Sequence, residues 1–286
     1  MHIGIEAPFA DSEAPSLVNL ARYPLHAPDS AQYARLIETS RATLRATGAL
    51  QLRGLLSTAG LARLADEGHR YSQKAAQGNV PMYPIGLPAA DDRVAREPGR
   101  WARTARARGL GYHAMQGTAM AALYRWAPLR DFVAKVTEQP RLYLHDDPSN
   151  ALVLMTYGPG DELPWHFDTA RFSSILHLTQ AAVGGEFEYV ADLRPQLEVD
   201  LQPLVDILDG RPAAARQAPT EPGSLTVIAG ARTLHRVTPV GRDTVRRALI
   251  LCYDDVPGQR MDVETRRRYF GPDAPDNEGN PGPAVS

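Results

Sequence analysis

The stretch "PWHFDT", residues 164–169, places His166 and Asp168 two positions apart, with aromatic residues at the alternate positions. Successive side chains of a β-strand point to opposite faces, so a strand here would project His166 and Asp168 from one face and Trp165 and Phe167 from the other. Two donors on one face can share a metal ion. A His-x-Asp triplet also arises often by chance, so its surroundings must decide between the two interpretations.

A second His-x-Asp triplet, "HDD" at 145–147, illustrates this hazard. It runs directly into "PSN" at 148–150, where a turn is expected. We therefore expect the side chains of the second triplet to be solvated and to lie outside a strand. The triplet at 166–168 has a β-rich setting that the second lacks.

Short β-rich segments follow one another from residue 141 to residue 254, separated by turn signals such as "GPGD" at 158–161 and "GG" at 184–185. About seven or eight short strands at this spacing argue for a β-sandwich or jelly roll. The predicted strands are "RLYL" 141–144, "ALVLMTY" 151–157, "PWHFD" 164–168, "FSSILHLTQ" 172–180, "EFEYV" 186–190, "SLTVIAG" 224–230, "HRVTPV" 235–240 and "RRALILCYD" 246–254.

Helices are expected mainly in the first half of the chain. Apolar residues recur at helical spacing over 31–46 and 115–136. After the strand-like segment 48–56, Ser57-Thr58 can cap a further helix. A short helix at 199–209 is expected as an insertion between strands.

These segments predict a single domain over 31–258, with helical support at 31–140 and the jelly-roll core at 141–258. Residues 1–30 show no period and are expected to form an irregular leader. Residues 259–286 are charged and then rich in Pro, Gly and Asn, which predicts a flexible tail.

The segment 77–112 is punctuated by Gly and Pro and contains six arginines, Arg93, Arg96, Arg100, Arg103, Arg106 and Arg108. We expect a solvated basic loop or helix face here. A loop that covers a substrate is the functional alternative, and this segment is the candidate lid.

The composition is that of a globular protein of 286 residues, 43% hydrophobic and with a net charge of −2. This charge gives no reason to expect a nucleic acid or an anionic membrane as partner. A single cysteine, Cys252, excludes an internal disulfide framework and a Cys-based zinc cluster. No apolar segment is long enough to span a membrane, and the expected location is the cytoplasm.

His235 is the candidate for a third metal ligand. It lies 69 residues after His166, at the start of a further strand-like segment. Two histidines and one carboxylate form a facial ligand set that suits Fe(II) and leaves coordination positions open. Such openness suits a chelating cosubstrate together with dioxygen.

The final strand supplies a candidate anion-binding residue. Arg246 falls on one face of the strand 246–254 and Arg247 on the other, so one arginine should point into the barrel. A buried guanidinium needs an anionic partner, and a carboxylate matches it best. The dicarboxylate 2-oxoglutarate could offer one carboxylate to this arginine and chelate the iron with its other end. Arg246 is preferred, but a slip of one residue would favour Arg247.

Together these residues resemble the Fe(II)/2-oxoglutarate-dependent oxygenases, whose core is a double-stranded β-helix, a jelly roll also found in cupins. The "HFD" of 166–168, the later "HRVTPV" and the "RRAL" at 246–249 are similar to the family's His-x-Asp, His and Arg-x-Ser/Ala motifs. The stretch "YGPGDELPWHFD" and the "GGEFEY" at 184–189 resemble the branch that contains the prolyl hydroxylases. The resemblance covers about 150–255.

The resemblance implies that His166, Asp168 and His235 bind iron. It further implies that Arg246 binds the distal carboxylate of 2-oxoglutarate and that the Tyr157 hydroxyl can bond this cosubstrate. Ala248 replaces the Ser or Thr frequent in the family, so another donor must complete the carboxylate site.

The implied reaction couples O2-dependent decarboxylation of 2-oxoglutarate, giving succinate and CO2, to hydroxylation of an unactivated C–H bond. Halogenating members of the superfamily have Gly or Ala in place of the aspartate, so Asp168 points to hydroxylation. The chain looks most similar to bacterial enzymes that act on free amino acids and small metabolites in biosynthesis, and Thr169, Ile250 and Cys252 are expected to face such a substrate.

Two alternatives remain at this stage. One is a peptidyl or prolyl hydroxylase acting on protein, which would need an open groove. The other is a non-enzymatic, cupin-like metal-binding protein, in which the arginine would have no anionic cosubstrate. The sequence also leaves open whether the protein forms a homodimer.

Overall fold

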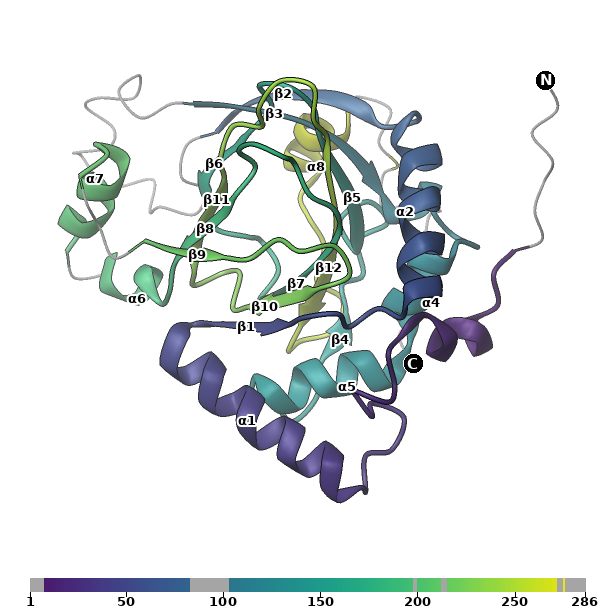
Figure 1. Cartoon of the computed structure of the whole chain (residues 1–286). Helices are drawn as coiled ribbons and strands as arrows, with labels where there is room; N and C mark the ends of the chain where they lie inside the picture. The colour runs from purple at the N-terminus through teal and green to yellow at the C-terminus, as the bar shows by residue number, and fades with distance from the viewer. Residues whose placement is uncertain (1–7, 83–102, 198–199, 212–214, 272–274, 276–286) are drawn as a thin grey trace, which may run out of the picture.

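Two antiparallel sheets form the core of the protein (Figure 1). This computed structural model describes residues 8–82, 103–197, 200–211, 215–271 and 275. The larger sheet has the order β1-β10-β7-β12-β5-β3-β2, with β4 also paired to β12, and the smaller sheet has the order β6-β11-β8-β9. The predicted double-stranded β-helix with supporting helices is confirmed.

The predicted strands of the core are all present, with shifts of a few residues at their ends. The strands of the larger sheet are β1 (Ala49–Leu52), β2 (Ala76–Met82), β3 (Arg103–Gly111), β4 (Tyr143–Leu144), β5 (Leu152–Tyr157), β7 (Phe172–Thr179), β10 (Leu225–Ile228) and β12 (Arg246–Asp254). Those of the smaller sheet are β6 (Leu163–His166), β8 (Phe187–Val190), β9 (Arg216–Ala218) and β11 (Leu234–Val237).

Helices of the N-terminal half cover the outer face of the larger sheet, and the short helices within 193–208 pack against the smaller sheet. The helical segments are η1 (Asp11–Leu17), α1 (Ala31–Thr47), α2 (Thr58–Ser72), η2 (Tyr112–Ala114), α4 (Ala119–Arg125), α5 (Ala127–Val136), α6 (Leu193–Leu197), α7 (Gln202–Leu208) and α8 (Val263–Phe270). The main apolar core lies between this sheet and the helices, and includes Leu64 of α2 and Leu176 of β7. At Gly68, a Cβ atom would lie only 2.9 Å from the Leu178 side chain, so this glycine allows α2 to approach β7 closely.

Helix capping explains two of the predicted helix starts. The Ser30 hydroxyl accepts a hydrogen bond from the backbone N–H of Tyr33 at the start of α1, and the Ser57 hydroxyl accepts one from Gly60 at the start of α2. The single helix expected over 115–136 is instead two helices. Trp126 has extended backbone angles between α4 and α5, and the next helix has a proline in its first turn.

The segment 77–112, expected to be a loop, contributes two strands to the larger sheet. β2 and β3 pair from Ala76↔Gly109 to Met82↔Arg103, and β3 then pairs with β5. The prediction failed because the arginines of β3 alternate with small residues, giving a strand whose apolar face lacks the usual large side chains. Residues 83–102, where most of the proposed lid falls, lie outside the described residues.

Both ends of the chain contribute more to the fold than expected. In the predicted leader, Leu17 and Leu25 are buried in the main core. In the predicted flexible tail, α8 forms and its Arg266 is only 1% exposed, so this part of the prediction is wrong. The charged composition predicted a solvated segment, but the Arg266 side chain is buried in an ion pair with Asp147.

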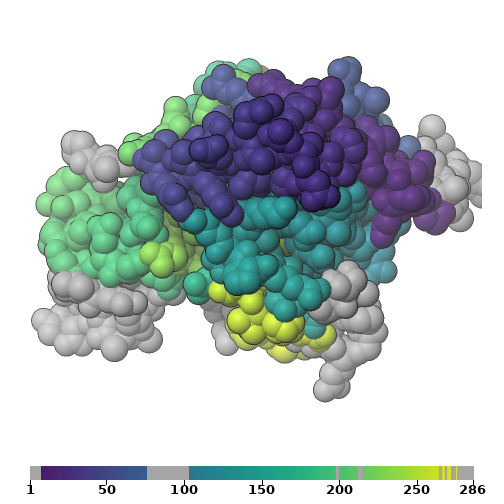
Figure 2. All heavy atoms as spheres, turned by 90° about the horizontal axis from the view of Figure 1, so that it is seen from below, coloured from purple at the N-terminus to yellow at the C-terminus, as the bar shows by residue number. Residues whose placement is uncertain are grey.

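The underside of the molecule is formed largely by helices. Seen from below, residues of the N-terminal region (purple and blue) lie against residues of the α4–α5 region (teal), in agreement with the packing of α1 on α5 (Figure 2). Within the described part of the chain, every helix is too short or too polar to cross a membrane.

Glu67 links α2 to the start of α4. Its carboxylate is 2% exposed and accepts hydrogen bonds from the backbone N–H groups of Ala119 (3.1 Å) and Met120 (3.2 Å) and from Arg63. A carboxylate at this position satisfies N–H groups that the first turn of a helix leaves unpaired.

We expect Glu67→Gln to lower the free energy of unfolding by about 1–3 kcal/mol, because one amide N–H2 must then face a buried donor. Urea denaturation measures this change. The control is Asp66, which forms an exposed ion pair with Arg70 on the same helix. Asp66→Asn should change the free energy of unfolding by less than about 0.5 kcal/mol. An equal effect of both substitutions would contradict the role given to Glu67.

Candidate functional site

The structure brings His166, Asp168 and His235 together at one end of the smaller sheet. His166 is the last residue of β6 and pairs directly with His235 of β11. One donor atom from each of the three residues lies within 4.8 Å of the others. Among the described residues, this is the one group of three His, Cys, Asp or Glu side chains close enough to hold a metal ion.

Asp168 reaches this cluster from beyond the strand. The sequence predicted a strand through residue 168, but β6 ends at His166 and the chain then bends, with the backbone N–H of Asp168 donating to the carbonyl of Gly230 (3.2 Å). Phe167 still points to the opposite side, where it is buried against Leu193 and Leu234.

Backbone carbonyls set the orientation of both imidazole rings. The Nδ1 atom of His166 lies 2.8 Å from the carbonyl oxygen of Pro164, and the Nδ1 atom of His235 lies 2.8 Å from that of Thr233. A carbonyl only accepts hydrogen bonds, so each Nδ1 carries a proton, and in the neutral form of each ring Nε2 has a free lone pair. Both Nε2 atoms point to Asp168, at 3.5 and 3.3 Å from Oδ1.

The two oxygens of Asp168 have different partners. Oδ1 faces the histidines, while Oδ2 accepts a hydrogen bond from the Ser173 hydroxyl at 2.6 Å. Gly230 packs against the same carboxylate, and a Cβ atom at this position would lie 2.4 Å from Oδ2. Ser173 and Gly230 therefore orient Asp168, and neither was identified from the sequence.

The ionisation of Asp168 depends on the two histidines beside it. Burial and the neighbouring His235 lower the pKa of His166, which keeps that ring neutral. Burial also opposes the charged form of His235, but the negative charge of Asp168 outweighs it and raises the pKa of His235. Burial alone would raise the pKa of Asp168; the two histidines overcome this and hold it well below its usual range.

Arg246 lies inside the barrel with its guanidinium 2% exposed. It pairs with Tyr157 across β12 and β5, and its Cζ atom lies 5.2 Å from the centre of the Tyr157 ring. Its Nη2 atom is 3.5 Å from Nδ1 of His177, and its buried Nε has no hydrogen-bond partner. None of the ion pairs among the described residues includes Arg246.

The choice between Arg246 and Arg247 follows from where the two side chains point. Arg247 turns to the outer face of the sheet, where Nε approaches the Ser72 hydroxyl (3.4 Å) and Nη2 approaches His69 of α2 (3.5 Å). Burial lowers the pKa of Arg246, opposed only by Tyr157, whereas an anion beside the guanidinium would stabilise its charge. Burial likewise raises the pKa of Tyr157 to about 12, so its hydroxyl stays protonated and can donate a hydrogen bond.

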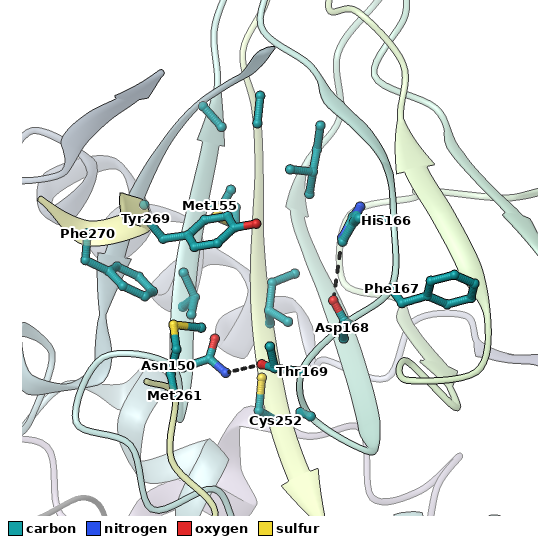
Figure 3. A pocket seen from close by; sticks show the side chains of 17 residues that line it. Asn150, Met155, His166, Phe167, Asp168, Thr169, Cys252, Met261, Tyr269 and Phe270 are labelled. Atoms are coloured by element: carbon teal, nitrogen blue, oxygen red, sulfur yellow. Dashed lines mark hydrogen bonds and ion pairs between the residues drawn. The ribbon is translucent and has the colours of Figure 1, made fainter. Parts of the chain in front are cut away.

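A cavity of about 130 Å³ adjoins the cluster (Figure 3). His166 and Asp168 lie on one side of it, and Tyr269 and Phe270 of α8 on the other. The residues expected from the sequence to face a substrate, Thr169, Ile250 and Cys252, all line this cavity. Sequence reasoning missed four further lining residues, Met155, Met261, Tyr269 and Phe270. The last three belong to the charged C-terminal segment, in which nothing indicates a return to the barrel.

The halogenase D family matches residues 93–270, which is more than half of the chain. The chain belongs to this family. The match spans β3, every strand of the smaller sheet and α8, so all three residues of the cluster lie within it. No curated protein matches the chain.

Solved structures with the same fold are distant in sequence from this halogenase D family member. The non-heme α-ketoglutarate-dependent epimerase SnoN from nogalamycin biosynthesis has a TM-score of 0.56 at 15% identity, covering 78% of this chain and 82% of SnoN. The carbocyclase SnoK has a TM-score of 0.54 at 14% identity, covering 76% and 83%. A prolyl hydroxylase from Trichoplax adhaerens, in complex with a hypoxia inducible factor peptide, has a TM-score of 0.51 at 11% identity, covering 80% and 96%. The fold is that of the Fe(II)/2-oxoglutarate-dependent oxygenases.

The second His-x-Asp triplet has a different role from the one expected. His145 and Asp147 are buried, at 3% and 0% exposed, and are not solvated. The turn was predicted correctly: Asp147 accepts hydrogen bonds from the backbone N–H groups of Ser149 and Asn150. Burial was missed because the partner of Asp147 is Arg266, more than a hundred residues later in the chain.

We expect Ser173→Ala to weaken binding of Fe(II) by about 10- to 100-fold, because the hydrogen bond that orients Asp168 is lost. Anaerobic titration with Fe(II) measures the affinity. Ser174 is the matched control, since it is the next residue of β7, equally buried, and its hydroxyl has no hydrogen-bond partner. Ser174→Ala should leave metal affinity unchanged; equal losses in both variants would show that Ser173 acts only through packing.

Proposed function

We propose that this protein is an Fe(II)- and 2-oxoglutarate-dependent dioxygenase that hydroxylates an unactivated C–H bond of a small metabolite, such as a free amino acid or a derivative. The observation that carries this proposal is the buried Arg246 guanidinium, which no carboxylate of the described residues neutralises. Burying an unpaired cation costs several kcal/mol, so a guanidinium buried inside a barrel without a ligand would destabilise the fold by about that amount. A carboxylate-bearing cosubstrate removes this cost.

The cluster suits iron by the chemistry of its donors. Two neutral Nε2 atoms and one carboxylate oxygen form a facial set that leaves positions open for a chelating ligand. In the proposed site His166, Asp168 and His235 hold the iron, Arg246 binds the distal carboxylate of 2-oxoglutarate, and the Tyr157 hydroxyl donates to the cosubstrate. Iron, 2-oxoglutarate and O2 supply the oxidising chemistry when bound. SnoN, with the same fold, has been solved with Fe3+ and α-ketoglutarate.

Asp168 favours hydroxylation over halogenation, although the family takes its name from a halogenase. A carboxylate occupies the position that Gly or Ala leaves free for a halide in halogenating members of the superfamily. The Ser173 hydrogen bond and the close contact with Gly230 hold the carboxylate there. These contacts support a carboxylate ligand, in place of a halide, at this position of the proposed site.

The pocket favours a small substrate over a protein. SnoN and the Trichoplax prolyl hydroxylase resemble this chain to a similar degree, yet one has been solved with nogalamycin RO and the other with a peptide. The fold is thus compatible with both substrate classes. The cavity beside Asp168 is closed on its far side by Tyr269 and Phe270, which leaves room for a small group more readily than for an extended peptide.

We expect Asp168→Ala to abolish substrate-dependent succinate formation, because it removes one of the three side chains that would hold the iron in this site. Succinate release in a screen of amino acids and small metabolites measures turnover. Asp192→Asn is the control, since Asp192 pairs with Arg232 at the surface and should not affect the reaction. Hydroxylated product from the Asp168→Ala protein would exclude Asp168 as an essential ligand.

Anaerobic addition of Fe(II) and 2-oxoglutarate should produce a weak metal-to-ligand charge-transfer band in the visible spectrum. A metal-binding protein that does not bind 2-oxoglutarate would not give this band. Arg246→Met should raise the concentration of 2-oxoglutarate that half-saturates this band by about 10- to 150-fold, the equivalent of 1.5–3 kcal/mol for hydrogen bonds to a charged group. Arg247→Met should leave it unchanged. The reverse order of effects would assign the carboxylate to Arg247.

A further inference from the structure

Small residues of β3 create the space beside the candidate metal site. Ala105, Ala107 and Gly109 face the cavity, while Arg106 and Arg108, which alternate with them, are exposed on the other face. At Gly109, a Cβ atom would lie 3.7 Å from both the sulfur of Met155 and the ring of Phe270, an ordinary contact distance. A longer side chain at this position would therefore extend into the cavity.

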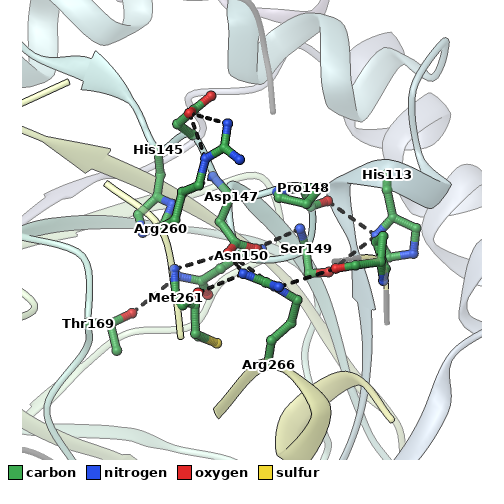
Figure 4. A network of polar contacts seen from close by, with 12 residues as sticks. His113, His145, Asp147, Pro148, Ser149, Asn150, Thr169, Arg260, Met261 and Arg266 are labelled. Carbon is green, nitrogen blue, oxygen red and sulfur yellow. Dashed lines mark hydrogen bonds and ion pairs between the residues drawn. The ribbon is translucent and has the colours of Figure 1, made fainter. Parts of the chain in front are cut away.

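Helix α8 forms the far wall of the cavity and is held by a buried ion pair (Figure 4). Nε and Nη2 of Arg266 lie 3.2 and 2.8 Å from Oδ2 of Asp147, and both residues are at most 1% exposed. The same oxygen accepts the backbone N–H of Met261 (3.0 Å), just before the helix. This network positions Tyr269 and Phe270 opposite His166.

The same loop places one polar pair at the end of the cavity. Oδ1 of Asp147 accepts the backbone N–H of Asn150, whose side-chain amide donates to the hydroxyl of Thr169 at 3.2 Å (Figures 3 and 4). Thr169 directly follows Asp168. The pair therefore offers a carbonyl oxygen and a hydroxyl to one polar group of a bound molecule.

The remaining described wall is apolar. Its other members are Val153, Met155, Leu163, Ile250, Cys252 and Met261 together with alanines and the aromatic residues already named. Burial raises the pKa of Cys252 well above its usual value, so the thiol is neutral. Among the described lining residues there is no lysine, arginine or glutamate, and the one carboxylate is Asp168. From the described walls, a charged group entering this space would gain no ionic partner other than the metal cluster in return for its lost hydration.

We propose that this cavity binds an uncharged, ring-shaped or branched hydrocarbon part of the substrate, between Tyr269–Phe270 and the metal site, with one hydrogen-bonding group directed at Asn150 and Thr169. This inference rests on the proposed function and narrows its substrate class. Any charged head group of a free amino acid lies outside these walls. The cavity, at about 130 Å³, is close to the volume of about 150 Å³ at which an engineered apolar cavity in another protein binds benzene.

Phenol and benzylammonium test the inference, because they share a ring and differ in charge. Ligand-observed NMR on the Zn(II)- and 2-oxoglutarate-loaded protein measures binding of each probe without turnover. We expect phenol to bind at least about tenfold more tightly than benzylammonium, as the cost of burying an unpaired cation requires. Equal or tighter binding of benzylammonium would overturn the inference.

Substitutions locate the binding. Gly109→Leu should weaken phenol binding at least about tenfold by filling the cavity, and Phe270→Ala should weaken it about 3- to 10-fold by removing one wall. The second variant keeps the test usable if the first does not fold, since Phe270 is only half-buried at the end of α8. Arg267→Ala, at an exposed position of the same helix, is the control and should have no effect. Unchanged binding in Phe270→Ala would place phenol elsewhere and overturn the inference.

The charge-transfer experiment separates this inference from the function on which it rests. A band with Fe(II) and 2-oxoglutarate, together with no preference for phenol, would support the oxygenase and overturn the apolar pocket. Tighter binding of phenol than of benzylammonium, without a charge-transfer band, would support the apolar pocket and overturn the proposed oxygenase function. In the second case the Gly109→Leu effect should persist in the metal-free protein.

Discussion

The antiparallel pairing of β6 with β11 is the interaction on which the candidate site depends. It places His166 directly opposite His235 in the smaller sheet, so that two imidazoles far apart in the chain present their Nε2 atoms to one point. Asp168 then needs only the short bend after β6 to complete the set. The backbone ladder thus sets the spacing of the two histidines.

Several charged side chains are buried inside the protein, and they differ in whether an opposite charge compensates them. Asp168 is compensated by two histidines, and Asp147 by Arg266, within the described chain. Arg246 has no such compensation, and the aromatic face of Tyr157 replaces it only weakly. A protein interior tolerates such a cation when a bound anion completes the site, which connects the stability of the fold to the cosubstrate proposed for it.

Helix α8 connects the end of the chain to the chemistry. Its buried arginine attaches it to the loop that carries Asn150, so the wall of the cavity and its polar end are parts of one network. The metal cluster and this network come from different parts of the fold. A change in α8, β3 or the 145–150 loop would therefore alter the wall of the cavity at residues other than the three of the cluster.

Much of the fold and the ligand cluster could be predicted from local pattern, because strand alternation and turn residues act over a few positions. The period of two predicted that His166 and Asp168 lie together, although Asp168 reaches the cluster through a bend after β6, and turn spacing indicated a jelly roll. The same logic could have found β3, where arginine alternates with small residues, but its lack of large apolar side chains concealed it. No local pattern reveals α8, since its burial depends on an ion pair between distant segments.

The sequence by itself determined the residue types: two histidines and a carboxylate at strand spacing, and two adjacent arginines on one strand. Tertiary structure alone decided which arginine enters the barrel, because the register of β12 with β5 and β7 directs Arg246 inward and Arg247 to α2. It also decided that Ser173 and Gly230 hold the carboxylate, and that α8 faces the metal site. These are contacts between segments far apart in the chain, which follow from how sheets and helices pack and not from any neighbouring residues.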